Sequence, residues 1–307
     1  MPSRSGPAVV LAIFGPTASG KTAVAEAVAD RIGGEVVSAD SMQAYRGLPL
    51  LTAQPTRPTR LVGIWPLAHE GSVAEYAELA HEAIDELLAA GRTPVVAGGT
   101  GLYLRAALAD LGLPPAPPPD VRAHWEGIYD RLGPERAHAA LAERDPRAAA
   151  QVHANDRRRV VRALELAQLG ASLTPSSDRL WTEEMRHETI VFGLDVPREI
   201  LIERIERRAR EMVAAGVAEE ARAALAGGVS PTAVHVLGLR EVAELPPDEA
   251  VEALIVRTRR YAAYQRKWMR RIPGLVSVNG NRPAEETADE IVEVARARQR
   301  LPAGRAG

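Results

Sequence analysis

The stretch GPTASGKT, residues 15–22, follows the pattern G-x-x-x-x-G-K-S/T of a phosphate-binding P-loop. Residues 9–14 before it form an apolar run of strand length, and residues 21–31 place their apolar side chains with helical periodicity. A strand, a glycine-rich loop and a helix in this order are what a P-loop needs, because the loop amides and the helix N-terminus then face one anion. Lys21 would contact the terminal phosphates, and the Thr22 hydroxyl would ligate Mg²⁺.

Strand and helix patterns alternate along much of the chain. We predict strands at 35–39, 93–97, 190–194 and 275–278, and helices at 73–90, 102–109, 198–226 and 248–271. This alternation predicts an α/β fold of the P-loop NTPase type, a parallel sheet flanked by helices.

A proline-rich stretch, LPPAPPPD at 113–120, interrupts the alternation, and residues 121–169 have a purely helical pattern. Because a strand pattern resumes near residue 190, we predict that the helical block is a domain inserted in the sequence between two strands of the sheet. The predicted divisions are a first core part (1–112), a helical insertion (113–187), a second core part (188–280) and a C-terminal helix and tail (281–307).

The composition excludes several classes of protein. The 307 residues are 46% hydrophobic and 25% charged with a formal net charge of -2, which predicts a globular protein with a sizeable core and no overall basic field. Without cysteine, the chain has no disulfide, no thiolate metal site and no cysteine nucleophile. The apolar run at 9–14 is too short for a membrane span or signal peptide, so we expect a cytoplasmic protein that contacts no membrane.

The position of acidic residues bears on the chemistry. A P-loop NTPase or kinase needs a second acid at a strand end to hold Mg²⁺, and the strand at 93–97 has none. Asp195 follows another strand, but a turn or helix cap is the simpler interpretation. Asp40 ends the strand at 35–39, where it should face a bound phosphate compound, or it caps a helix that begins at Ser41.

Six blocks in order now indicate a family. They are GPTASGKT with SADSMQAYRG (38–47), VVAGGTGLYLRAAL (95–108), HANDRRRVVRALEL (153–166), ERIERRAREMVAAGVAEEARAAL (203–225), TAVHVLGLREV (232–242) and RTRRYAAYQRKWMR (257–270). The chain resembles the bacterial tRNA dimethylallyltransferases, also called tRNA isopentenyltransferases, over most of residues 9–270.

The resemblance implies a reaction in which no phosphoryl group is transferred. A dimethylallyl group passes from dimethylallyl diphosphate to the exocyclic N6 amine of the adenosine 3′ of the anticodon, in tRNAs that read codons beginning with U. Mg²⁺ on Thr22 would assist the departing diphosphate, Asp40 would accept the amine proton, and Lys21 and Arg208 would act on the diphosphate. The residues expected to bind the diphosphate are Gly15, Pro16, Thr17, Ala18, Ser19, Gly20, Lys21 and Thr22.

The partner implied is the tRNA anticodon stem-loop, bound by a monomer through the helical insertion and by residues of the core. Residues assigned to tRNA on the resemblance are Asp40, Ser41, Met42, Gln43, Thr100, Arg122, Arg158, Arg159, Arg162, His235 and Arg240. For the arginines of 153–166 a solvated helix face is the alternative. The basic segment 257–271 carries three interleaved aromatic residues, which suits RNA stacking but is also typical of a core.

The chain departs from the family pattern in places. Residues 48–55 (LPLLTAQP) replace the usual D-I-G-T-A-K-P, and the following loop is shorter. Further departures are His235, Leu239, Ala263, Tyr264 and Lys267. They leave the details of tRNA contact open, but they do not touch the P-loop or Asp40.

Three other functions compete with this interpretation. An adenylate dimethylallyltransferase would act on free AMP with the same P-loop and Asp40, but it needs no helical insertion. A small-molecule P-loop kinase lacks its second Mg²⁺ acid here, and a non-enzymatic RNA-binding NTPase switch gives Asp40 no task.

Overall fold

The computed structural model describes residues 9–114, 116–174 and 179–298, and the chain divides into two compact units. The core unit contains the chain through Leu111 and again from Glu183, and the helical unit is Gly112–Thr182. Each unit has its own buried cluster of hydrophobic residues.

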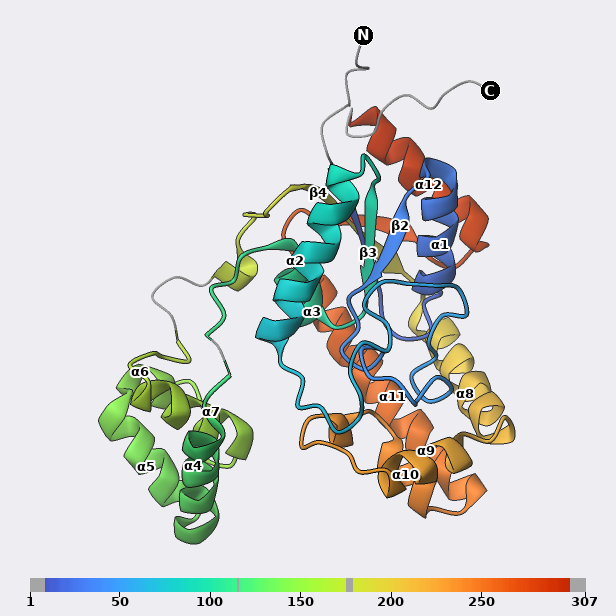
Figure 1. Ribbon diagram of the computed structural model, residues 1–307. Helices are drawn as coiled ribbons and strands as arrows, with labels where there is room; N and C mark the ends of the chain where they lie inside the picture. Colours follow the sequence, from blue (N-terminus) through green and yellow to red (C-terminus); the bar gives the residue numbers. More distant parts are fainter. Residues whose placement is uncertain (1–8, 115, 175–178, 299–307) are drawn as a thin grey trace. The chain divides into compact units, whose positions relative to one another are not determined.

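Five strands of the described chain form one parallel sheet in the order β2-β3-β1-β4-β5 (Figure 1). The strands are β1 (Val9–Phe14), β2 (Glu35–Ser38), β3 (Pro94–Gly98), β4 (Glu188–Asp195) and β5 (Val276–Asn279). Parallel strands bring their carboxyl ends to one edge, so the loops after β1, β2 and β3 meet there. The predicted α/β fold is confirmed.

Helices cover both faces of the sheet. The helices of the core are α1 (Lys21–Ile32), α2 (Val73–Ala89), α3 (Gly101–Leu108), α8 (Arg198–Ala214), α9 (Val217–Ala226), η2 (Ala233–His235), α10 (Leu239–Glu244), α11 (Pro247–Met269) and α12 (Ala284–Ala297). Figure 1 shows α1 with α12 on one face of the sheet and α2 with α3 on the other. In β1, Leu11 and Ile13 belong to the buried cluster under α1 and α12, while Ala12 and Phe14 belong to the cluster under α2 and α3. The strand is therefore apolar on both faces.

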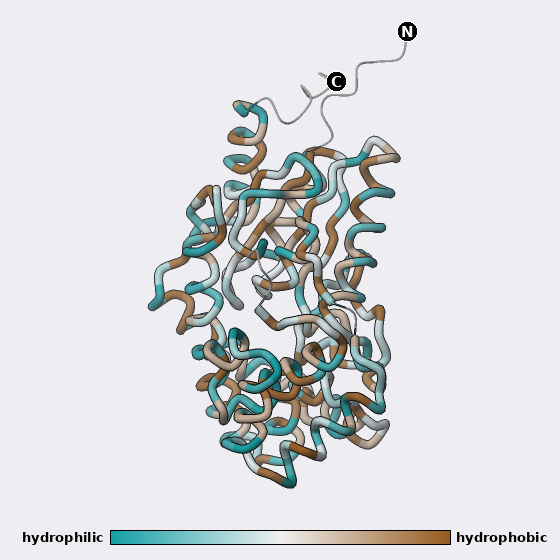
Figure 2. Tube along the Cα trace, turned by 90° about the vertical axis from the view of Figure 1, so that its left-hand side faces the viewer, coloured by the Kyte–Doolittle hydropathy of each residue, from teal (hydrophilic) through white to brown (hydrophobic). Residues whose placement is uncertain are grey.

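The helices are amphipathic, and hydrophobic and hydrophilic residues alternate along them in Figure 2. The single helix predicted over 198–226 is wrong, because α8 and α9 are separated at Gly216. Gly216 has a φ of 91°, in the left-handed region that favours glycine, and the chain turns there. No helix among the described residues is both long and apolar enough to cross a membrane.

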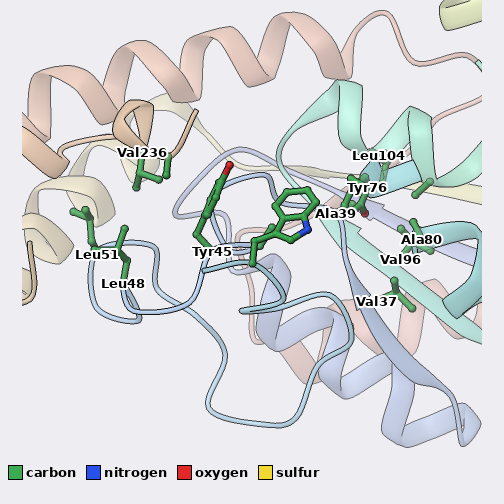
Figure 3. Packing of buried hydrophobic residues seen from close by; sticks show 14 of the residues in the cluster. Val37, Ala39, Tyr45, Leu48, Leu51, Tyr76, Ala80, Val96, Leu104 and Val236 are labelled. Carbon is green, nitrogen blue, oxygen red and sulfur yellow. The ribbon is translucent and has the colours of Figure 1, made fainter. Parts of the chain in front are cut away.

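The segment between β2 and α2 packs into the core although it has no strand or helix. Figure 3 shows Leu48, Leu51 and Val236 together near Tyr45, with Val37 lying apart on strand β2 of the sheet. The Glu220 carboxylate on α9 accepts hydrogen bonds from the Leu50 and Leu51 amides at 2.9 and 2.8 Å. Of the leucines that distinguish this chain from the family pattern, Leu48 and Leu51 are therefore part of its core, while Leu50 is exposed.

The helical unit is built from short helices around Trp125, Tyr129 and Leu164. They are α4 (Pro119–Leu132), α5 (Pro134–Arg144), α6 (Pro146–Ala149), α7 (Arg157–Gln168) and η1 (Arg179–Trp181). The unit ends at Thr182 and not at the predicted residue 187.

The five residues after Thr182 belong to the core, and two of them, Arg186 and His187, are bound to its helices. The Arg186 amide donates to the Leu108 carbonyl at the end of α3, over 2.9 Å. The Arg186 guanidinium and the His187 ring contact the Asp85 carboxylate of α2 at 2.9 and 2.6 Å. The residues just before β4 are therefore held to α2 and α3 by polar contacts, which the apolar pattern from residue 190 did not predict.

Substitution of Gly98 tests how closely the end of β3 packs against the backbone of Ala39. A Cβ atom there would lie 2.0 Å from the backbone oxygen of Ala39, so we expect Gly98→Ala to lower the free energy of unfolding of the core by about 1–3 kcal/mol. Gly227→Ala is the control, since its Cβ would make ordinary contacts and should change stability by less than about 0.5 kcal/mol. Equal denaturant midpoints for both variants would contradict the packing.

Candidate active site

The P-loop has the backbone of an anion cradle. Ala18 and Gly20 both have positive φ, 64° and 86°, and the Ser19 amide donates to the Pro16 carbonyl at 3.2 Å. These turns direct successive amides inward, and α1 begins directly at Lys21. A left-handed alanine costs about 1–3 kcal/mol, which the fold accepts at this loop.

Three charged groups meet beside the loop: Lys21, Asp40 and Arg208. Burial lowers the pKa of Lys21; the nearby Arg208 lowers it further and Asp40 opposes the shift. Burial also lowers the pKa of Arg208, again against Asp40. Two cations that have lost water are stabilised by an entering polyanion, which is what a phosphate site requires.

Two arginines of α8 reach the P-loop. Arg208 Nη1 lies 3.5 Å from the Thr17 hydroxyl, as expected for a residue assigned to the diphosphate. Arg204 was not predicted, yet its Nη1 lies 3.4 Å from the Ala18 carbonyl and its Nη2 donates to Asn281 at 3.1 Å. The sequence held one indication of this role: Arg204 lies four residues before Arg208, a spacing that places both arginines on one helix face.

Asp40 follows β2 and lies at the same edge. One carboxylate oxygen, Oδ1, accepts a hydrogen bond from the Met42 amide at 3.0 Å. No helix begins at Ser41, since residues 41–44 form a turn, so the alternative of a helix cap is wrong. A carboxylate has further acceptor positions, so this hydrogen bond leaves Asp40 able to accept a proton.

Two cavities of the core meet at Asp40. The polar cavity is lined by Thr17, Ala18, Gly20, Lys21, Thr22, Ala23, Asp40, Gln43, Thr52, Ala53, Arg204, Arg207, Arg208 and Glu211. The apolar cavity is lined by Thr17, Ala18, Asp40, Met42, Leu51, Thr52, Ile205, Arg208, Ala209, Met212, Leu237, Leu254, Thr258, Tyr261 and Gln265. Since Thr17, Asp40 and Arg208 belong to both walls, a ligand that fills them has a charged end and a hydrocarbon end.

Gln265 of α11 connects the P-loop to the turn after β3, and sequence reasoning missed it. Its Oε1 accepts from the Thr17 amide at 2.7 Å, and its Nε2 donates to the Gly99 carbonyl at 2.9 Å. The side chain is 1% exposed, and a Cβ on Gly99 would lie 2.3 Å from Nε2. Glycine at 99 is therefore required by contact with this amide.

The turn after β3 also contacts the loop after β2. Thr100 Oγ1 lies 3.4 Å from the Ser41 amide, 3.2 Å from the Ser41 hydroxyl and 3.1 Å from the Tyr261 hydroxyl. Burial, with the charge of Asp40, raises the pKa of Tyr261, so this phenol stays protonated and can donate. Ser41 and Thr100, both assigned to the target base, are thus brought together.

Known proteins match the chain over this site. The profile of the family described as IPP transferase matches residues 43–272, and that described as isopentenyl transferase matches 8–61. This chain belongs to the IPP transferase family.

Individual relatives of the family extend the match. The tRNA dimethylallyltransferase of Anaeromyxobacter dehalogenans (strain 2CP-C) is 43% identical over 277 residues, 86% of this chain and 92% of that protein. The full-length tRNA isopentenylpyrophosphate transferase of Bacillus halodurans has a TM-score of 0.69 at 32% identity, covering 95% of this chain and 97% of that one. The corresponding enzyme of Staphylococcus epidermidis has a TM-score of 0.67 at 28% identity, covering 94% and 99%.

Other residues of this chain that are assigned to tRNA have different surroundings. Met42 lines the apolar cavity. Gln43 lines the polar one, but its Nε2 donates to the Thr52 and Ala53 carbonyls and its Oε1 accepts from Ser38, so a base must displace bonds within the loop. His235 and Arg240 are exposed on η2 and α10 and line neither of the two cavities.

The arginines of the helical unit divide into two groups. Arg122 and Arg162 form ion pairs at 3.1 Å with Glu165, whose side chain is 2% exposed, so they neutralise a buried carboxylate. Arg159 pairs with Asp156 at 3.7 Å, and Arg158 is exposed. Of the four, Arg158 and Arg159 have the exposure that an RNA contact needs.

The bridge formed by Gln265 has a measurable consequence. Gln265→Ala leaves a P-loop amide and the Gly99 carbonyl without their partner, so we expect about tenfold weaker binding of inorganic diphosphate by calorimetry. Gln265→Glu still accepts from Thr17 but cannot donate to Gly99, and we expect an intermediate affinity. Wild-type affinity for the alanine variant, with its fold intact by circular dichroism, would contradict a positioning role.

Proposed function

We propose that this chain transfers a dimethylallyl group from dimethylallyl diphosphate to the N6 amine of the adenosine 3′ of the anticodon, in tRNAs that read codons beginning with U. The observation that carries the proposal is the pair of cavities joined at Asp40 and Arg208. A diphosphate in the P-loop would direct its hydrocarbon chain along the wall formed by Met212, Leu237 and Leu254. The names of the relatives support the same reaction.

The polar cavity stabilises the leaving group. When the bond between the dimethylallyl carbon and the diphosphate oxygen breaks, negative charge develops on the diphosphate. The P-loop amides, Lys21 and Arg208 surround that position, and preorganised donors of this kind lower the barrier to bond breaking.

The donors of the polar cavity suit a magnesium ion that arrives with the diphosphate. Thr22 and Asp40 line the same cavity, while the described residues contain no group of three His, Asp or Glu that would hold a metal alone. Mg²⁺ commonly takes few protein ligands and completes its shell with substrate phosphates and water. Held by Thr22 and the diphosphate, it would neutralise charge on the leaving group.

Asp40 serves the nucleophile. The adenine amine nitrogen forms the new bond to the dimethylallyl carbon, the carbon–oxygen bond to the diphosphate breaks, and the amine proton passes to the Asp40 carboxylate. The adenine lies beside Ser41 and Thr100, which lie together at the same edge of the sheet. To reach them the base leaves the stack of the anticodon loop, as in other enzymes that modify a base.

Mass spectrometry tests the reaction directly. After incubation with dimethylallyl diphosphate and Mg²⁺, digested tRNA should contain adenosine heavier by one dimethylallyl group, in tRNAs whose anticodon ends in A. Transfer to AMP with none to tRNA would establish an adenylate dimethylallyltransferase. Phosphoryl transfer from ATP to a small acceptor would establish a kinase.

The role of Asp40 as base predicts a rate effect without a binding effect. Asparagine retains the acceptor for the Met42 amide but takes no proton, so Asp40→Asn should slow single-turnover transfer by about 10²–10⁴ with both substrates saturating. Its melting temperature and diphosphate affinity should be unchanged. Asp195→Asn is the control, since Asp195 is exposed at the end of β4. A normal rate for Asp40→Asn would remove Asp40 from catalysis.

The role of Lys21 predicts a binding effect with a distinct pH dependence. Lys21→Ala should weaken diphosphate binding sharply, and Lys21→Arg should not restore it, since the wider guanidinium does not fit between phosphate oxygens. The protonated amine binds the anion, so wild-type affinity should fall as the pH rises, starting below the ordinary lysine value of 10.5, because the pKa is lowered. Titration calorimetry across pH measures both, and an unchanged affinity for Lys21→Ala would contradict the role.

A further inference from the structure

One aromatic residue of α11, Tyr264, is exposed one helical turn from Tyr261, whose hydroxyl contacts Thr100. Of the three aromatic residues interleaved in the basic segment, Tyr261 contacts Thr100, and Trp268 packs where a Cβ on Gly101 would lie 2.2 Å from its ring. Tyr264 is 55% exposed. Its ring meets Trp268 edge to face, with centroids 6.4 Å apart and planes at 70°, which leaves Tyr264 available for stacking.

Two cations accompany Tyr264 on the same flank of α11. Arg260 precedes it by four residues and Lys267 follows it by three, spacings that place side chains together on a helix. Both are exposed, and neither side chain has a hydrogen bond or ion pair with the described part of the chain. Arg257 and Arg259, by contrast, are paired with Glu241 and Glu206.

We propose that Tyr264 stacks on a nucleobase next to the target adenosine in the anticodon loop, and that Arg260 and Lys267 contact the adjoining phosphates. The inference rests on the proposed function and names a contact for its RNA. Extruding the target base deprives its neighbour of a stacking partner, and an aromatic side chain one turn of α11 from the contact between Tyr261 and Thr100 replaces it. A single aromatic ring between unpaired cations matches single-stranded RNA, which offers a base and a phosphate at each nucleotide.

Equilibrium binding of an unmodified anticodon stem-loop tests the stacking. Tyr264→Ala should bind this RNA about tenfold more weakly than wild type, while Tyr264→Phe should stay within about twofold because its ring still stacks. Binding of dimethylallyl diphosphate and the single-turnover rate at saturating RNA should not change. Since Tyr264 is exposed, both variants should fold.

Salt dependence tests the cations. Arg260→Gln and Lys267→Gln should each reduce the slope of log affinity against log salt by about 0.7, the value for one phosphate contact with a single strand. Arg259→Gln is the charge-matched control, since Arg259 lies on another flank of α11 and is paired with Glu206, and its slope should equal that of wild type.

The outcomes separate the inference from the function on which it rests. If wild type modifies tRNA but Tyr264→Ala binds the stem-loop with wild-type affinity, the stacking is wrong and the proposed function stands. If wild type neither binds nor modifies tRNA, both are wrong. Loss of a wild-type dimer in Tyr264→Ala, with RNA affinity retained, would assign this surface to a second copy of the chain.

Discussion

The buried amide of Gln265 accepts from the Thr17 amide and donates to the Gly99 carbonyl, and the arrangement of the catalytic edge depends on this pair of bonds. The contact requires Gly99 to lack a side chain, as contact with Trp268 requires of Gly101 and contact with Ala39 requires of Gly98. The register of α11 is thereby fixed against the ends of β1 and β3. Whatever moves α11 along its axis also moves the phosphate loop.

Gln265 makes its hydrogen bonds within the protein, whereas the charged groups of the site need a bound anion. Lys21 and Arg208 lie beside Asp40 and are partly stripped of water, so both have lowered pKa values and neither is at its most stable without an anion. The left-handed Ala18 adds backbone strain to the same loop. The core that surrounds the loop, apolar on both faces of the sheet, supports these local costs. Binding energy from a polyanion is thus available for orientation and charge stabilisation.

Much of this arrangement follows from local sequence. The P-loop motif fixes the strand, turn and helix around Lys21, and parallel topology then requires Asp40 to lie at the same edge. Gln265 was not predictable, because it meets Thr17 across 248 positions and nothing in a helical pattern distinguishes it from a surface glutamine. Arg162 was assigned to RNA because a sequence does not show that Glu165 beside it is buried. The sequence predicted most strands and helices, but it did not predict which side chains of distant elements contact one another.

The hydrogen bond between the Arg186 amide and the Leu108 carbonyl holds together the two points at which the chain leaves the core and returns to it. The helical unit is therefore one long loop of the core, and this hydrogen bond joins the two ends of that loop. The entropic cost of closing a loop grows only with the logarithm of its length. Residues can therefore be gained or lost within the helical unit with little effect on the stability of the sheet. The part of the chain most free to diverge in size is thus separated from the part that carries the chemistry.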